Sequence, residues 1–115
     1  MSDFVTLKRN CDFRRIYARG KSAVSPALVV YFMRNHTGKN RVGFTTSKKI
    51  GNAVTRNRAR RILKEGLRRV MPDIKTGYDF VLVARNKTKY LKSTDISAAL
   101  TTLLKDKGLI LPVEE

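Results

Sequence analysis

Side chains that could do covalent or metal chemistry are few in this chain. It has one His and one Cys, and 9 Asp or Glu against 25 Lys or Arg. His36 cannot form a two-His metal site, and Cys11 has no base except that distant His to make it a nucleophile. Glu65, Asp73 and Asp79 are dispersed, whereas two-metal nuclease chemistry needs several carboxylates around ions about 4 Å apart. We therefore expect no catalytic residue and no metal ligand in this chain.

The basic side chains, in contrast, are concentrated. Residues 48–69 hold nine Lys or Arg and one acid, so half of the net charge of +16 lies in this segment. Cations at a helix start oppose the helix dipole by a few tenths of a kcal/mol each at exposed sites. A phosphate bound there would make the arrangement favourable, because the free N–H groups of the helix start and the Arg guanidinium groups would bind it together. The alternative is a solvated basic face that serves only solubility, and the one-signed charge favours a polyanionic partner.

Three helices are expected to carry these side chains. Asn10 can cap the first, which ends at Gly20. The second has apolar residues at helical spacing from Ala59 to Val70, with the basic side chains on its remaining surface. The third begins near Ser93 or Thr94 and ends at Gly108.

Strands are expected at 28–34, 41–47 and 78–85, with a weaker one at 21–23. The first two are interpreted as a hairpin with a loop of several residues. The third is almost continuously apolar, which favours a central position in a sheet. Residues 41–85 then form a βαβ unit, and one sheet of about four strands with helices packed on it would bury all the apolar stripes.

The chain length fits one domain, residues 1–115, with no repeat or linker. A membrane surface is the competing polyanion, but no apolar run approaches the roughly 20 residues that span a bilayer. No signal peptide is visible, and a lone Cys gives no disulfide framework. These features predict a cytoplasmic protein with no membrane partner.

One segment resembles a known family. Its order is Ser47-Lys48-Lys49-Ile50-Gly51-Asn52-Ala53-Val54, followed by Arg56-Asn57-Arg58 and Arg60-Arg61. This resembles the signature segment of bacterial ribonuclease P proteins, and residues 12–20, 28–31, 41–44 and 77–85 resemble other parts of that family. Asn86 stands where the family often has Pro, and Thr45-Thr46 are more polar than usual, but neither departure touches the basic segment. The tail after Gly108 has no motif to carry over.

The resemblance implies a fold and a set of contacts. The fold is an α/β (α+β) two-layer sandwich of order α-β-β-β-α-β-α, with a left-handed βαβ crossover. Such a crossover is unusual, because βαβ crossovers are right-handed in roughly 98% of cases. The implied RNA-binding residues are Lys48, Lys49, Asn52, Arg56, Asn57, Arg58, Arg60, Arg61, Lys64 and Arg68. The implied cleft for the single-stranded 5′ leader of precursor tRNA is lined by Phe13, Tyr17, Val29 and Tyr31.

Aromatic faces beside cations suit a sequence-tolerant single-strand site, and the alternative is that these rings are simply core residues. The implied partners are the catalytic RNA subunit of ribonuclease P and precursor tRNA, in a 1:1 protein–RNA complex. Mg²⁺ is expected at the RNA subunit and the RNA–protein interface, and the RNA subunit is expected to perform the hydrolysis of an endoribonuclease. Two alternatives remain: a general or ribosome-associated RNA-binding module, and a self-sufficient protein nuclease.

Overall fold

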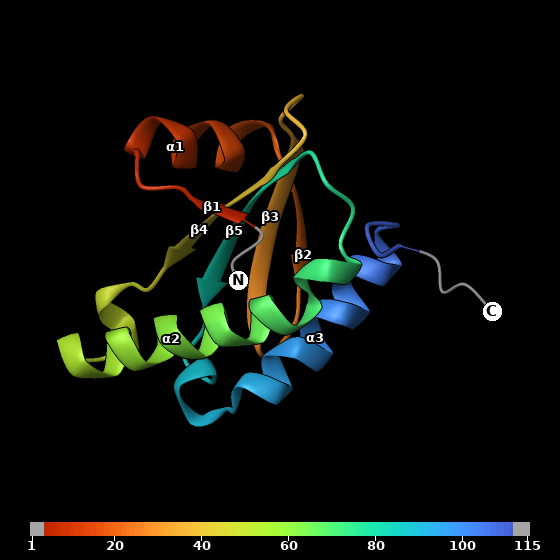
Figure 1. Ribbon diagram of the computed structural model, residues 1–115. Helices are drawn as coiled ribbons and strands as arrows, with labels where there is room; N and C mark the ends of the chain where they lie inside the picture. The colour runs from red at the N-terminus through yellow and green to blue at the C-terminus, as the bar shows by residue number, and fades with distance from the viewer. Residues whose placement is uncertain (1–3, 112–115) are drawn as a thin grey trace.

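The computed structural model describes residues 4–111 as three α-helices against one five-stranded mixed sheet (Figure 1). The elements are β1 (Phe4–Thr6), α1 (Asn10–Arg19), β2 (Lys21–Val24), β3 (Leu28–Arg34), β4 (Asn40–Thr45), α2 (Ala53–Val70), β5 (Tyr78–Ala84) and α3 (Ser93–Asp106). Short 3₁₀ turns are η1 (Lys48–Ile50), η2 (Met71–Asp73) and η3 (Thr88–Tyr90). The expected α+β fold and its element order are confirmed. The fifth strand is β1, which adds to the sheet edge by parallel pairing with β4.

The strand order is β1-β4-β5-β3-β2. The apolar β5 is central, as its sequence predicts, and it pairs antiparallel with β3 and parallel with β4. The prediction that 28–34 and 41–47 form a hairpin is therefore wrong. Because β5 has no charged residue except Asp79, it gains most by lying between two strands, and it separates β3 from β4. The β3–β4 loop passes over the start of β5, where the Asn35 N–H donates to the Gly77 carbonyl at 2.9 Å.

Alternating side chains send two hydrophobic clusters to the two faces of the sheet. On one face, Phe80 and Leu82 pack with residues of α2 and α3 in the larger cluster. On the other face, Val81 packs with Ile16 of α1 and with Leu7. The expected two-layer sandwich thus describes the larger side, and α1 adds a smaller helical cover on the opposite face (Figure 1).

The connection from β4 through α2 to β5 has the implied unusual hand. In Figure 1 both strands point down, α2 passes in front of the sheet, and β5 lies to the right of β4. That arrangement is a left-handed crossover, the reverse of the usual one. Its effect is to place the start of α2 beyond the sheet edge, past the end of β4 (Figure 1).

Candidate RNA interface

The basic segment begins in a loop that is fixed at several points. After η1, Gly51 has φ of 147°, a value that favours glycine and turns the chain into α2. The Asn52 side chain then caps the helix by accepting from the Thr55 N–H at 2.9 Å. From a distant part of the chain, Lys89 Nζ donates to the Ile50 carbonyl at 2.7 Å. The loop that presents the cations is therefore held by the helix cap and by η3.

The helix α2 separates its apolar and basic residues onto different faces. Its buried residues are Ala59, Ile62, Leu63, Gly66, Leu67 and Val70. The predicted RNA-binding residues are exposed, except that Arg56 and Lys64 are half-buried. Within residues 4–111, ion pairs are made only by Arg15 and Arg41, so no cation of α2 has an acidic partner there. The α2 surface therefore carries uncompensated positive charge.

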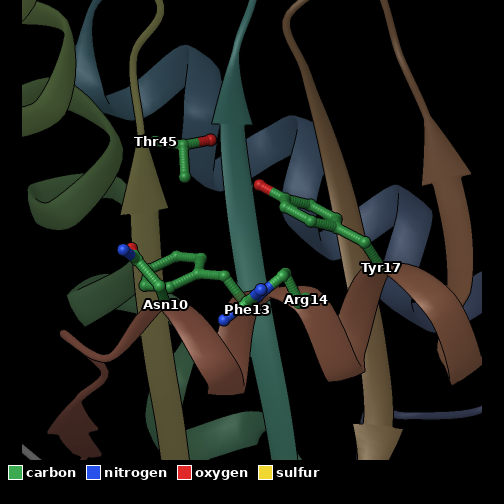
Figure 2. A pocket seen from close by; sticks show the side chains of 5 residues that line it. All are labelled: Asn10, Phe13, Arg14, Tyr17 and Thr45. Carbon is green, nitrogen blue, oxygen red and sulfur yellow. The ribbon is translucent and has the colours of Figure 1, made fainter.

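A cleft with a volume of about 550 Å³ opens beside α1, on the face of the sheet opposite α2. Figure 2 shows its lining residues, which are Asn10, Phe13, Arg14, Tyr17 and Thr45. The Phe13 ring lies on Gly43 of β4, where a Cβ atom would come within 2.5 Å of two ring carbons. Because any side chain at residue 43 would displace the Phe13 ring toward the cleft, Gly43 sets the depth of the cleft floor.

The predicted cleft residues are only partly brought together. Tyr17 lines the cleft and meets Tyr31 of β3 edge to face, with ring centroids 4.8 Å apart and an interplanar angle of 82°. Tyr31 is half-buried beneath this contact and does not line the cavity itself. Val29 is half-buried and two residues earlier on the same face of β3, outside the lining. Tyr31 therefore supports the Tyr17 ring from the side.

Three lining residues were not predicted. Asn10 and Arg14 share one side of α1 with Phe13 and Tyr17, since the four are spaced i, i+3, i+4 and i+7. That spacing was the signal that could have found them. Thr45 reaches the cleft only because β4 ends there, which no local pattern shows.

The cleft and the basic surface meet at the end of β4. Thr45 lines the cleft, and the next residue, Thr46, accepts a hydrogen bond at 3.5 Å from Arg60 Nη2 of α2. The two surfaces lie on opposite faces of the sheet, but they join at this edge. A ligand in the cleft and a ligand on the basic surface could therefore lie next to each other at this edge.

The most buried acid among residues 4–111 belongs to a structural network. Asp79 accepts hydrogen bonds at 2.7 Å from both Nε and Nη2 of Arg41, at 2.9 Å from Asn35 Nδ2, and at 3.4 Å from Arg15 Nη2. Burial opposes ionisation of Asp79, but the hydrogen bonds from Arg41 and Asn35 and the neighbouring positive charges outweigh it and hold its pKa below the usual value. The hydrogen bonds from Arg41 to Asp79 raise the pKa of Arg41 and outweigh the opposing effect of burial. This carboxylate of β5 therefore joins β4, α1 and the β3–β4 loop.

The other candidate chemical groups are scattered over the described part of the chain. His36 lies exposed in the β3–β4 loop, and Cys11 is exposed on α1. Glu65 and Asp73 are exposed on α2 and η2. Between residues 4 and 111, no three His, Cys, Asp or Glu side chains gather where they could hold a metal ion. Over the same residues, no helix is both long and apolar enough to cross a bilayer.

Comparison with known proteins agrees with this geometry. The family model described as ribonuclease P matches residues 1–108. The ribonuclease P protein component of Clostridium botulinum (strain Loch Maree / Type A3) is 43% identical over 90% of this chain and 94% of its own length. The solved ribonuclease P protein of Staphylococcus aureus superposes with a TM-score of 0.79 at 33% identity, over 91% of this chain and 96% of that one. That of Thermotoga maritima gives a TM-score of 0.78 at 29% identity, over 96% and 98%.

The fold, the uncompensated basic helix and these relatives define an RNA-binding subunit of a tRNA-processing nuclease. The chain belongs to the ribonuclease P protein family.

Proposed function

We propose that this protein binds the catalytic RNA subunit of ribonuclease P through the start of α2 and holds the 5′ leader of precursor tRNA in the cleft beside α1. One protein binds one RNA subunit, and the complex removes the leader to give the mature tRNA 5′ end. The observation that carries the proposal is the junction of the two surfaces at Thr45 and Thr46. A single strand in the cleft thereby lies next to the RNA that the basic surface binds.

The physical roles of the two surfaces differ. Exposed Arg and Lys of α2 would neutralise phosphates of a folded RNA, a contact that weakens steeply with salt. The Tyr17 ring, 42% exposed and supported by Tyr31, offers a face on which a leader base can stack without sequence preference. Arg14 beside it would contact the leader phosphates.

The hydrolysis itself is assigned to the RNA subunit. Cleaving a phosphodiester needs an activated water, charge stabilisation at phosphorus and help for the leaving oxygen. The chain supplies positive charge, but Asp79 is engaged by two arginines and an amide. Mg²⁺ is accordingly expected on RNA phosphates and at the RNA–protein interface, with no dedicated ligand set among residues 4–111.

The decisive experiment is leader removal in a reconstituted complex. We expect the protein alone to cleave nothing, and the RNA subunit at low Mg²⁺ to cleave precursor tRNA well only when the protein is added. Cleavage by the protein alone would indicate a protein nuclease. RNA binding without stimulated cleavage would indicate a general RNA-binding module.

A second experiment locates the catalytic groups. Single substitutions that remove each candidate group should leave the cleavage step near wild type under single-turnover, saturating conditions; the groups are Cys11, His36, Glu65, Asp73 and Asp79. A fall of a hundredfold or more in that step, with fold and RNA binding intact, would place a catalytic group in the protein.

A further inference from the structure

An exposed aromatic ring lies next to the basic loop, outside the surfaces described above. Tyr90, the last residue of η3, is 79% exposed. Together with Lys89 of the same turn and with Thr55 and Arg58 of α2, it lines an open hollow of about 440 Å³. Single exposed rings are common on protein surfaces, so the ring alone carries no conclusion. Its neighbours carry the argument, because Lys89 is fixed by a hydrogen bond and the exposed Arg58 lines the same hollow.

The cation beside the ring is held in place. Lys89 Nζ lies 5.3 Å from the centroid of the Tyr90 ring and donates to the Ile50 carbonyl at 2.7 Å. A cation over one side of the ring makes a favourable cation–π contact and fixes the ring orientation. Because most of the ring surface stays in solvent, its other side is open to a planar ligand.

The hollow has the chemistry of a nucleotide site. A base can stack on the open side of Tyr90, since every base has a π-face. Arg58 is exposed, has no acidic partner in the described chain, and offers a guanidinium fork for the adjoining phosphate. Thr55, which carries a hydroxyl, lines the same hollow. The Tyr90 ring and the Arg58 guanidinium thus offer the stacking and phosphate contacts that an unpaired nucleotide can make.

The place of Tyr90 in the fold indicates which RNA it contacts, the RNA subunit or the leader. Leu91, the next residue, packs on the core cluster that α2 and α3 cover, on the sheet face opposite α1. A leader lying in the cleft of α1 is therefore on the other side of the sheet. We propose that Tyr90 stacks on an unpaired base of the RNA subunit, with Lys89 behind the ring and Arg58 on the adjoining phosphate. This inference rests on the proposed function and adds a single-strand contact to the phosphate contacts of α2.

The affinity test uses two matched substitutions. Tyr90→Leu removes the ring and should weaken binding of the RNA subunit by roughly 5- to 150-fold, whereas Tyr90→Phe keeps the ring and should bind as wild type. Since the lost contact is uncharged, Tyr90→Leu should leave the slope of log K against log salt unchanged, while Arg58→Ala should lower it. The high exposure of Tyr90 predicts an unchanged melting temperature for both Tyr90 variants. Wild-type affinity for Tyr90→Leu would overturn the proposal.

A direct test uses fluorescence, because the chain has no Trp. In the Tyr90→Trp variant, adding the RNA subunit should quench the emission and protect it from acrylamide, as stacking on a base does. A leader oligonucleotide alone should leave it unchanged, whereas it should quench a Tyr17→Trp control. Quenching of the Tyr90→Trp variant by the leader, or no response to the RNA subunit, would overturn the assignment.

Failure of the stacking site can be distinguished from failure of the proposed function. If the wild-type protein binds the RNA subunit no better than an unrelated RNA of equal length, the proposed function fails. If the wild type binds specifically but both Tyr90 tests are negative, only the stacking site fails.

Discussion

The contribution of the α2 cations can be measured from the salt dependence of RNA binding. Arg58 and Arg61 are exposed and Arg56 is half-buried, and all three lie in the first half of the helix. We expect the triple Ala variant to bind the RNA subunit more weakly with its fold intact. Each lost phosphate contact lowers the slope of log K against log salt by about 0.7 to 0.9, so three contacts lower it by roughly 2.1 to 2.7 units.

This slope difference translates into a large, measurable effect. Between about 50 and 200 mM salt, wild-type affinity should fall roughly 20- to 40-fold further than that of the triple variant. Filter binding or fluorescence anisotropy at four or five salt concentrations, with Mg²⁺ held constant, measures both slopes. Circular dichroism checks that the variant is folded.

The matched control removes three charges elsewhere. Lys105 and Lys107 are exposed at the C-terminal end of α3, and the exposed Lys75 donates its N–H to the Leu109 carbonyl just beyond that end. The end of α3 lies far from the start of α2 (Figure 1). Their triple Ala variant has the same net charge as the first but should keep a slope close to wild type. Equal slope losses in the two variants would show that diffuse charge, and not the α2 surface, determines binding, and would refute the placement.

Three further predictions follow from the cleft and the buried network. Tyr17→Ala should weaken binding of leader-bearing precursor by about 1–3 kcal/mol but leave mature tRNA binding unchanged, and equal losses for both ligands would mean that the ring is structural. Gly43→Ala should push the Phe13 ring into the cleft and weaken leader binding while the RNA subunit binds as before; unchanged leader affinity would contradict this role for the cleft floor. Asp79→Asn should lower the free energy of unfolding at neutral pH by about 2 kcal/mol. This is less than the ~3–5 kcal/mol lost when a fully buried ion pair is broken, because the Arg41 side chain is 30% exposed. Since folding lowers the pKa of Asp79, its contribution is full above the unfolded pKa of about 3.9 and is lost as pH falls through the folded value, so urea unfolding of wild type and variant should converge in acid.

The sequence predicted those parts of the fold that depend on local patterns. The stripe from Ala59 to Val70 located α2, because helical spacing is set within a few residues. The apolar run of β5 predicted its central place. The three-residue β1 was missed because it is too short to show a period, and the false hairpin arose because β5, which separates β3 from β4, comes later in the chain.

The residues of the candidate site were likewise predictable only where they depend on a local pattern. The basic surface could be located from the sequence since its charge is contiguous, and the structure places those side chains on exposed or half-buried positions. The cleft was found only in part: Thr45 and the Gly43 floor depend on how α1 crosses β4, a contact between residues about thirty apart in the chain. The Arg41–Asp79 pair joins two strands across the α2 crossover and has no local signal at all.

The central place of β5 has a consequence for how the chain folds as it is made. Until residues 78–84 leave the ribosome, β3 and β4 have no strand between them, and each exposes an unpaired edge. The chain must close the long connections from β3 and β4 to β5 before these strands pair, which makes folding slow. The α2 helix, which precedes β5 in the chain, is therefore synthesised before the sheet that fixes its position exists. Fragments that end before Tyr78 should accordingly remain unfolded and prone to aggregate, even though they contain the whole basic segment.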